Sequence, residues 1–232
     1  GWSLEVSTGG VCTGVAPDAG ECPVLTRSYS CSEIQGIFAN GGTLTVGECK
    51  TFSNNSIKYL PDYSQTISTV EVVMTGNVTD LNIVNLVGYH TFPNDLQLTL
   101  ISPAGTSVTF INNSFSCGPT SINIKFDEAG EDAFYPCPLN DGVAYKTING
   151  DFANFIGEAA AGTWSLVIND NVTGDCGFLC GWSLEISTGA SCTGTAPDAG
   201  TCPPLKDIYT CPELKEVFSN GNTVIPAPDN SM

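Results

Sequence analysis

Five acidic residues stand where a metal ion could bind: Asp95, Asp127, Glu128, Asp170 and Asp175. Each lies at the end of a short apolar run or in a stretch that contains Gly or Asn, which is typical of loops. Calcium takes about six to eight oxygen ligands, several of them carboxylates. These residues therefore predict a calcium site, with a solvated acidic rim as the alternative interpretation.

A hydrolytic site is a second chemistry to consider. The only histidine is His90, and Ser107 lies in "AGTSV" (104–108), which superficially resembles a subtilisin nucleophile stretch. A Ser-His-Asp site needs its serine exposed on a strained turn, within hydrogen-bond reach of the base. Ser107 instead leads into a strand-like run after a Pro-Ala-Gly turn. The sequence thus predicts no catalytic site and no enzyme.

The chain has 11 cysteines in 232 residues, which indicates disulfides and a secreted, extracellular location. Proximity in the sequence suggests the pairs Cys12–Cys22, Cys31–Cys49, Cys117–Cys137 and Cys176–Cys180, although sequence alone does not determine connectivity. Cys192 and Cys202 are further disulfide candidates. Cys211 has no evident partner and could be free, or pair with another subunit or with a cysteine outside this stretch.

The charge balance limits the classes of partner that the protein can bind. The chain has 24 Asp and Glu but only 7 Lys and Arg, which gives a net charge of −17. Such a surface repels nucleic acid and anionic lipid. No apolar run approaches the roughly 18 residues of a membrane span. We therefore expect neither nucleic-acid binding nor membrane insertion, and a surface suited to divalent cations.

A long internal repeat indicates how the chain is divided into domains and connectors. Residues 1–41 and 181–221 match at more than half of their positions, from "GWSLEVS" and "GWSLEIS" to the final Asn-Gly. The sequence is therefore expected to be a window on a tandem array, with neighbouring copies as partners. The expected parts are the last strand of a preceding domain (1–9), a Cys-rich connector (10–56), one whole domain (57–189), a second connector (190–226) and the start of the next domain (227–232).

Residues 57–189 are expected to be all-β. Short runs rich in Val, Ile, Leu and Thr alternate with Gly, Pro, Asn and Asp, at 68–76, 81–89, 95–103, 106–112, 120–126, 162–170 and 181–187. Such spacing predicts a jelly-roll β-sandwich. Within the connectors, "SEIQGIFANGG" (32–42) and "PELKEVFSNGN" (212–222) place apolar residues at helical spacing and end at Asn-Gly. Each connector is expected to hold one short helix beside a disulfide loop.

Three segments then show a family resemblance. "HTFPNDLQLTLISPAGTSVTFINN" (90–113), "IKFDEAG" (124–130) and "FIGEAAAGTWSLVINDNVTGDCGFLCGWSLEIS" (155–187) closely resemble the P domain, or P/homo B domain. This module follows the catalytic domain of proprotein convertases and other secreted subtilisin-like proteases, and occurs in large bacterial and archaeal surface proteins. The resemblance implies an eight-stranded jelly roll, and it supports calcium at the acidic residues named above. The Cys-rich connectors lie outside it.

Three functions remain open after this comparison. The repeat favours a structural segment of a surface fibre, filament or adhesin stalk. The alternatives are a non-catalytic P domain that stabilises a secreted subtilisin-like protease, and a jelly roll that binds glycan or protein. Four Asn-x-Ser/Thr sequons add candidate glycosylation sites at Asn54, Asn77, Asn112 and Asn171.

Overall fold

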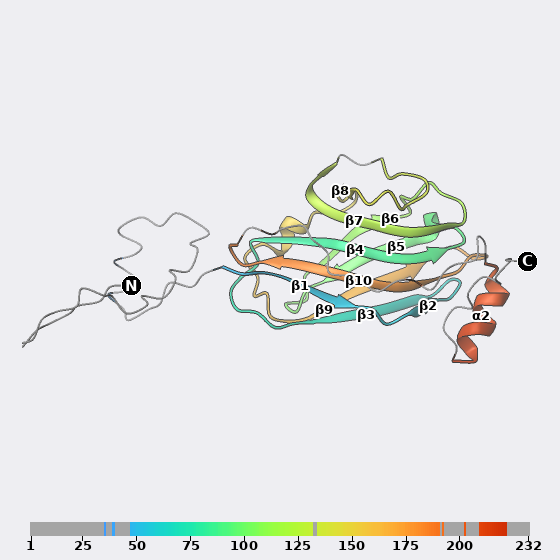
Figure 1. Cartoon of the computed structure of the whole chain (residues 1–232), viewed down its shortest axis with the longest axis horizontal. Coiled ribbons are helices and arrows are strands. Elements are labelled where there is room, and N and C mark those ends of the chain that lie inside the picture. The colour runs from blue at the N-terminus through green and yellow to red at the C-terminus, as the bar shows by residue number, and fades with distance from the viewer. Residues whose placement is uncertain are drawn as a thin grey trace, which may run out of the picture. The chain divides into compact units, whose positions relative to one another are not determined.

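The computed structural model describes residues 35, 39, 47–131, 134–190, 192, 202 and 209–221. The chain divides into two units, residues 1–47 and 48–232. Every strand and helix described below belongs to the second unit, a sandwich of two β-sheets (Figure 1). The prediction of an all-β sandwich is thereby confirmed.

Two sheets make the sandwich. The six-stranded sheet has the order β1 (Cys49–Asn54), β10 (Gly177–Ser187), β4 (Asp80–His90), β7 (Thr120–Glu131) and β8 (Ala144–Tyr145), and β2 (Lys58–Leu60) also pairs with β10. The four-stranded sheet has the order β3 (Gln65–Val72), β9 (Gly162–Asp170), β5 (Leu96–Ile101) and β6 (Ser107–Asn112). All the described strand pairs are antiparallel except β7 with β8. Short 3₁₀ helices η1 (Pro93–Asp95) and η2 (Phe152–Phe155) lie in the connections. One α-helix, α2 (Cys211–Ser219), follows the last strand.

Two tryptophans centre the core between the layers. Trp164 on β9 and Trp182 on β10 are both fully buried. The indole N–H of Trp164 donates to the Ala160 carbonyl at 2.9 Å, and that of Trp182 donates to Ser68 Oγ at 3.0 Å. Each ring therefore buries a large apolar surface and leaves no polar atom unpaired. The alternation on both strands directs these tryptophans inward.

The centre of the six-stranded sheet depends on two glycines. A Cβ at Gly177 would lie 2.1 Å from the Tyr89 carbonyl oxygen, and one at Gly88 would lie 2.4 Å from the Phe178 carbonyl oxygen. Real side chains do not tolerate such distances to backbone atoms. Glycine at both positions thus allows β4 and β10 to approach beside their shared bulge.

The domain boundary differs from the one predicted. Residues 49–54, which were assigned to the connector, form β1 and pair with β10 from Cys49–Ser187 to Asn54–Trp182. Thr51 is polar and half-buried and Ser53 is polar and exposed, as an edge strand with one solvated face allows. The alternation of "CKTFSN" was too weakly apolar to be recognised as a strand.

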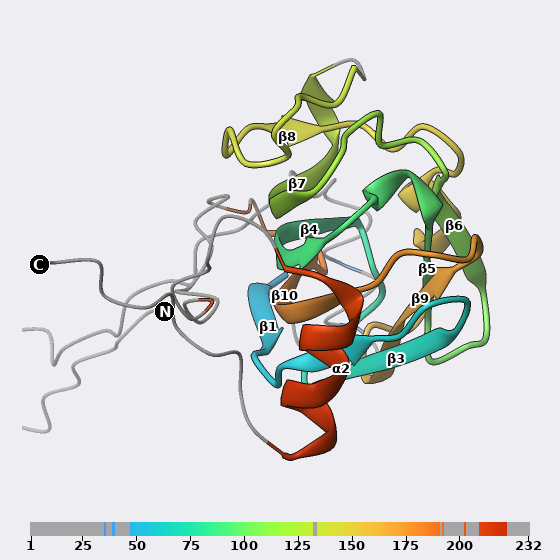
Figure 2. The same cartoon turned by 90° about the vertical axis from the view of Figure 1, so that its right-hand side faces the viewer.

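The outer face of β10 is also buried. Every residue of this strand is buried, including Ser183, Glu185 and Ser187, which point away from the sandwich core. At the other end of the same face, Tyr89, Phe178 and Cys180 form a second apolar cluster with side chains that follow the sandwich. Figure 2 shows α2 lying across this end of the sheet. β10, at the centre of the six-stranded sheet, is therefore covered on both faces.

We call residues 192, 202 and 209–221 the C-terminal strap. Three disulfides link it to the sheet: Cys49–Cys192, Cys180–Cys202 and Cys176–Cys211. Because Cys49 pairs with Ser187, successive attachment points run back along β10 from its end to its beginning. The segment predicted to be an independent connector is therefore part of the domain that precedes it.

The disulfide pairing corrects the one inferred from proximity. Cys117–Cys137 is confirmed. The predicted pair Cys176–Cys180 is wrong, because outer-face residues of β10 reach cysteines of the strap instead. Cys31–Cys49 is also wrong, since Cys49 bonds Cys192, 143 residues away. Cys211, left without a partner in the prediction, bonds Cys176.

Some predictions fall on residues outside the described ones. These are the strand at 1–9, the cysteines Cys12, Cys22 and Cys31, and the start of a further domain at 227–232. The helix predicted at 212–222 is confirmed as α2, and residues Gln35 and Ala39 of the other predicted helix are both helical. Within the described part of the chain, no helix has the length and apolarity to cross a bilayer.

Candidate metal centre

Three of the five predicted metal ligands gather at one end of the sandwich. Asp95 ends η1, Asp170 ends β9, and Asp175 lies in the turn before β10. Leu96 pairs with Asp170 across β5 and β9, and the Asn171 N–H donates to the Asp95 carbonyl at 3.0 Å. Asp95 and Asp170 are 3% and 4% exposed. The fold therefore buries two adjacent carboxylates in its interior.

His90 lies against this acidic pair. Its Nδ1 accepts a hydrogen bond from the Phe92 N–H at 3.2 Å, so the ring proton of the neutral imidazole is on Nε2. Nε2 lies 3.3 Å from Asp170 Oδ2, although the N–H is not aligned for a good hydrogen bond. A protonated Nε2 has no lone pair for a cation. His90 is thus a neighbour of Asp170 and not a metal ligand.

Asp95 is electrostatically disfavoured as an anion. Burial raises the pKa of its carboxyl above the ordinary value, and the charges of Asp170, Asp175 and Asp62 raise it further, while His90 opposes them. The Asp95 Oδ2 and Asp170 Oδ2 atoms are both buried and accept no hydrogen bond. A buried carboxylate oxygen without a hydrogen bond is costly unless a proton or a cation neutralises it.

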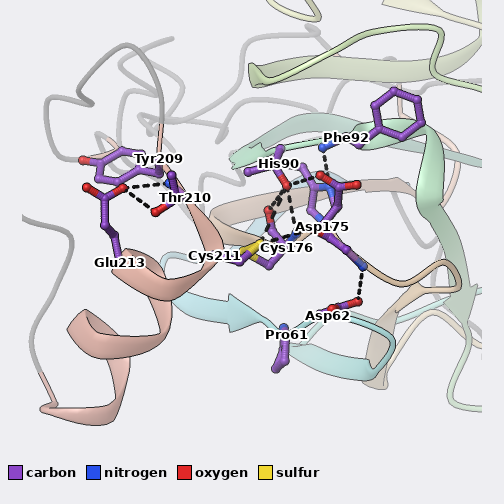
Figure 3. Close-up of a disulfide and its surroundings, with 12 residues drawn as sticks. Pro61, Asp62, His90, Phe92, Asp175, Cys176, Tyr209, Thr210, Cys211 and Glu213 are labelled. Atoms are coloured by element: carbon purple, nitrogen blue, oxygen red, sulfur yellow. Dashed lines mark hydrogen bonds between the residues drawn. A yellow bond between two sulfur atoms is a disulfide. The ribbon is translucent and has the colours of Figure 1, made fainter.

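Asp175 and Asp62 form the rim of this cluster. Asp175 Oδ1 accepts from Thr91 Oγ1 at 2.7 Å, and Asp62 Oδ1 accepts from the Gly174 N–H at 3.0 Å. Figure 3 shows Asp175 next to Cys176 of the Cys176–Cys211 disulfide, and Asp62 at the other end of a hydrogen bond to the turn before it. The sequence analysis missed Asp62. Its one signal was its place in "PDYSQ", which the repeat echoes as "PDNSM" at 228–232.

These side chains offer the oxygen ligands that a hard cation prefers, but too few of them to complete its coordination. Asp95 and Asp170 would hold calcium through their unpaired Oδ2 atoms, and Asp175 could add an oxygen from the rim. In the described residues, no three carboxylate or imidazole atoms here lie within 4.8 Å of one another. Calcium needs about six to eight oxygens, so backbone carbonyls and water would have to supply the others.

The other two predicted ligands lie elsewhere. Asp127 and Glu128 are on β7, seven residues from Thr120, which pairs with His90. At about 3.3 Å per residue, roughly 23 Å of strand separates the two groups. Asp127 Oδ1 accepts from the Ala129 N–H, and Glu128 Oε1 accepts from Thr147 Oγ1 and the Phe152 N–H. These carboxylates order the turn around β8 and η2.

A second group of ligand-type atoms lies at the start of the strap. The sulfurs of Cys49 and Cys192 and a carboxylate oxygen of Glu185 are within 4.8 Å of one another. The two sulfurs are bonded to each other in a disulfide, and only a free thiolate is a good metal ligand. The group therefore covers the buried Glu185 and is not a metal site.

The structure separates the two residues considered for catalysis. His90 is fully buried at the end of β4, beside Asp95 and Asp170. Ser107 is exposed at the start of β6, where it pairs with Ile101, at the far end of β5 from Asp95. About 17 Å of strand lies between these ends. The described residues therefore form no Ser-His-Asp arrangement around the only histidine.

The four candidate glycosylation sites differ in access. Asn77, Asn112 and Asn171 are exposed. Asn54 is half-buried, and its side-chain amide donates to the Thr69 carbonyl at 2.7 Å. A glycan on Asn54 Nδ2 would compete with that hydrogen bond. Glycosylation remains a prediction, strongest at the three exposed residues.

Part of this chain matches a family model. The model is described as the proprotein convertase P-domain. It matches residues 83–186. The match runs from the middle of β4 to the next-to-last residue of β10, and so includes Asp95, Asp170 and Asp175. The strap and β1 to β3 lie outside the P-domain match.

Two solved structures are similar to the chain. One is a serine protease of Aeromonas sobria in complex with a chaperone, at 18% identity and a TM-score of 0.41, covering 69% of this chain and 30% of that chain. The other is the serine protease of Aeromonas sobria, at 18% identity and a TM-score of 0.40, covering 67% and 29%. This chain thus spans less than a third of either protein. No curated protein sequence matches it.

Proposed function

We propose that this chain is a non-catalytic P-domain module of a secreted protein, and that it stabilises a subtilisin-like protease domain. The observation that carries the proposal is the P-domain match over residues 83–186 in a sandwich whose only histidine is buried. Four described disulfides support a secreted, oxidised protein. Such a module contributes stability and orientation, and the chemistry belongs to another domain.

The test is to label the native protein with a fluorophosphonate probe, which reacts with activated serine nucleophiles. We expect a labelled peptide that lies outside residues 48–221, together with loss of labelling at a lower temperature when residues 48–221 are deleted. A native protein with no labelled serine would contradict the proposal. Labelling that survives the deletion with unchanged thermal stability would contradict the stabilising role.

A second candidate function is a structural array of such modules at the cell surface. It is favoured by the repeat of residues 181–221 at residues 1–41, because a protease needs only one or two P domains. Electron micrographs of the native material separate the two candidates. Beads at a regular spacing along a fibre support the array, whereas isolated particles with probe-labelled protease support the first proposal.

A glycan-binding or protein-binding role has less support. A shallow hollow of about 620 Å³ lies beside the end of β3, where Lys50, Val73 and Met74 are among its lining residues. None of its lining residues is aromatic. Sugar rings are usually recognised by stacking on aromatic faces, which this hollow lacks.

A further inference from the structure

We propose that Thr91 and the disulfide from Cys176 to helix α2 position Asp175 as the third carboxylate of the candidate cation site. Thr91 and Cys176 act through Asp175 and are therefore positioning residues. The strap thereby sets the affinity of the site for its cation. The inference rests on the calcium site predicted above and is independent of the protease proposal, so either can fail without the other.

The cation site has two buried carboxylates and needs further oxygens. Asp95 and Asp170 are almost completely buried, and one oxygen of each accepts no hydrogen bond. Calcium takes about six to eight oxygen ligands, so these two carboxylates cannot complete its coordination. Burial raises the pKa of Asp95, and the charges of Asp170 and Asp175 raise it further, which places Asp175 within electrostatic reach. The position of Asp175 therefore decides whether a third carboxylate takes part.

Asp175 belongs to a turn, residues 171–176, that joins β9 to β10. At the start of the turn, the Asn171 N–H donates to the Asp95 carbonyl at 3.0 Å. Further along, the Gly174 N–H donates to Asp62 Oδ1 at 3.0 Å, and Gly174 has a φ of 115°, which favours glycine. These contacts hold the backbone of the turn and do not involve the Asp175 side chain.

The Thr91 hydroxyl fixes the Asp175 carboxylate to the end of β4. Thr91 Oγ1 donates to Asp175 Oδ1 at 2.7 Å and accepts from the Cys176 N–H at 2.9 Å. The Thr91 N–H also donates to the Cys176 carbonyl at 2.9 Å. The hydroxyl has one proton, and Asp175 Oδ1 is nearer to it than the Cys176 carbonyl at 3.1 Å. One oxygen of Asp175 is used in this way, and the other can serve a cation.

The disulfide adds a second link, from the same turn to the strap. Cys176 is bonded to Cys211, the first residue of α2 (Figure 3). The Cys211 sulfur lies 3.9 Å from Thr91 Oγ1 and 4.0 Å from the Gly174 carbonyl oxygen. The start of the helix therefore contacts the residues on both sides of Asp175 and the hydroxyl that holds its carboxylate.

α2 can serve as an anchor because it is itself fixed to the sheet. Leu214 is fully buried beneath the helix, and Phe218 stacks on Tyr59 with ring centroids 5.1 Å apart. Thr210 begins a capping box, which satisfies backbone donors that a helix start otherwise leaves unpaired. The disulfide thus ties the Asp175 turn to a packed helix.

The two links should act on affinity. A ligand side chain that moves in the free protein must be ordered when the cation binds, and this ordering lowers the affinity. Thr91 and the disulfide keep Asp175 in place before the cation arrives. Loss of either link should therefore weaken cation binding even where the sandwich stays folded.

The decisive experiment is a double-mutant cycle on the full, oxidised chain, measured by calcium titration calorimetry at neutral pH. One arm replaces Cys176 and Cys211 together by Ser, which leaves no free thiol, and the other arm is Asp175→Asn. We expect each arm to weaken calcium binding about tenfold. The combined variant should bind no more weakly than Asp175→Asn alone, because the disulfide acts through Asp175.

Two results of this cycle would overturn the proposal. Losses that multiply, to about a hundredfold in the combined variant, would mean that the disulfide and Asp175 act independently. A wild-type chain that binds no calcium would remove the site on which the inference rests.

The matched control replaces Cys180 and Cys202 together by Ser. This change also removes one strap disulfide, but Cys180 is four residues beyond Cys176, about 13 Å along an extended chain. Its calcium affinity should stay within about twofold of wild type, as is usual for distant sites. A loss as large as that of the Cys176 arm would mean that general loosening of the strap sets the affinity, contrary to the proposal.

Thr91 tests the other link without touching a disulfide. Thr91→Val removes the hydroxyl and keeps the shape of the side chain, so calcium binding should weaken about tenfold. Thr91→Ser keeps the hydroxyl and should bind calcium nearly as tightly as wild type. Equal affinities of Thr91→Val and wild type would contradict the role of the hydroxyl, as would a loss in Thr91→Ser that matches the loss in Thr91→Val.

Discussion

At the scale of single residues, Asp95 gives a prediction about pH. Its pKa in the folded chain is above the ordinary value of 3.8, because of burial and neighbouring carboxylates. The folded state thus binds the Asp95 proton more tightly than the unfolded state does. The stability this contributes is full below about pH 3.8 and is lost as the pH rises through the folded pKa. In chelator at pH 7, Asp95→Asn should therefore raise the melting temperature by a few degrees (~3 °C).

Below the ordinary pKa of aspartate this advantage should vanish, because wild-type Asp95 is then protonated and as neutral as Asn. Thermal melts of both proteins in chelator at pH 3 and pH 7 supply the comparison. A destabilised Asp95→Asn protein at pH 7 in chelator would show that the ionised carboxylate is favourable in the fold, contrary to this argument.

With calcium in place of chelator, the wild type should have a higher melting temperature than Asp95→Asn. A cation held by the unpaired oxygens of Asp95 and Asp170 stabilises only the folded state, by about 2.7 kcal/mol at a hundredfold excess over its dissociation constant. Added calcium should raise the wild-type melting temperature by roughly 5–10 °C and leave Asp95→Asn nearly unchanged. Asp127→Asn is the control and should respond as wild type does. Equal responses from Asp95→Asn and wild type would exclude this site.

Three residues of the acidic cluster could be predicted from the sequence, and Asp62 at its rim could not. Asp95, Asp170 and Asp175 were recognisable because each ends a strand-like run or lies in a matched motif. Asp127 and Glu128 had the same local signal, yet β7 carries them to the opposite end of the sheet. Asp62 had no chemistry-bearing neighbour in sequence. The direction of each strand decides which carboxylates lie close together. A local sequence pattern does not reveal that direction.

At the scale of elements, the contact between β4 and β10 permits a sharp test. Gly177→Ala would place a methyl group against the Tyr89 carbonyl, so the two central strands would have to separate. We expect a loss of at least about 2 kcal/mol, which is a fall of roughly 4–8 °C in the melting temperature. Gly118→Ala is the control, because nothing lies within 4 Å of its Cβ position. Similar melting curves for the two variants would contradict the close approach.

The attachment of α2 gives a second prediction at this scale. Leu214 is fully buried beneath the helix, and Leu214→Ala should cost about 2–5 kcal/mol. Glu216, two residues along, is exposed, and Glu216→Ala should change stability by less than about 0.5 kcal/mol. Denaturant unfolding of the two variants measures both values. If Leu214→Ala also stays within that range, α2 is not part of the cooperative unit.

Seven strands of the sandwich could be predicted from the sequence, and three could not. The predicted runs correspond to β3, β4, β5, β6, β7, β9 and β10. The missed β1, β2 and β8 are short or half-polar, and they are ordered by their pairing with longer strands. Two of the predicted disulfide pairs were wrong for the same reason. Cys49 and Cys192 are 143 residues apart and meet only because β1 pairs with β10.

At the scale of the whole molecule, the unit runs from β1 through the C-terminal strap. Residues 48–221 contain eight cysteines, and all eight are paired within that range. The repeat predicts a unit made of a domain and a connector. The three strap disulfides attach the second Cys-rich segment to the sandwich before it.

This organisation predicts how the molecule responds to reduction. Three of the four described disulfides hold the strap, while the main core between the sheets is built from side chains such as Trp164, Trp182 and Phe110 and includes one disulfide cysteine, Cys117. Reduction should therefore free the strap and leave the sandwich folded. Trypsin should then cut at Lys215 on α2, and should still spare Lys125 in the middle of β7.

Limited proteolysis with and without reductant, with thiol counting to verify reduction, measures both sites. Each lost disulfide removes about 3–5 kcal/mol of constraint, and the strap is then held only by the apolar contacts of Tyr209, Leu214 and Phe218. Resistance at Lys215 after complete reduction would mean that Leu214 and Phe218 suffice to hold α2. Cleavage at Lys125 at the same rate as at Lys215 would mean that the disulfides hold the sandwich itself. Cleavage confined to the strap is expected only if the strap is a separately fastened layer over the sheet.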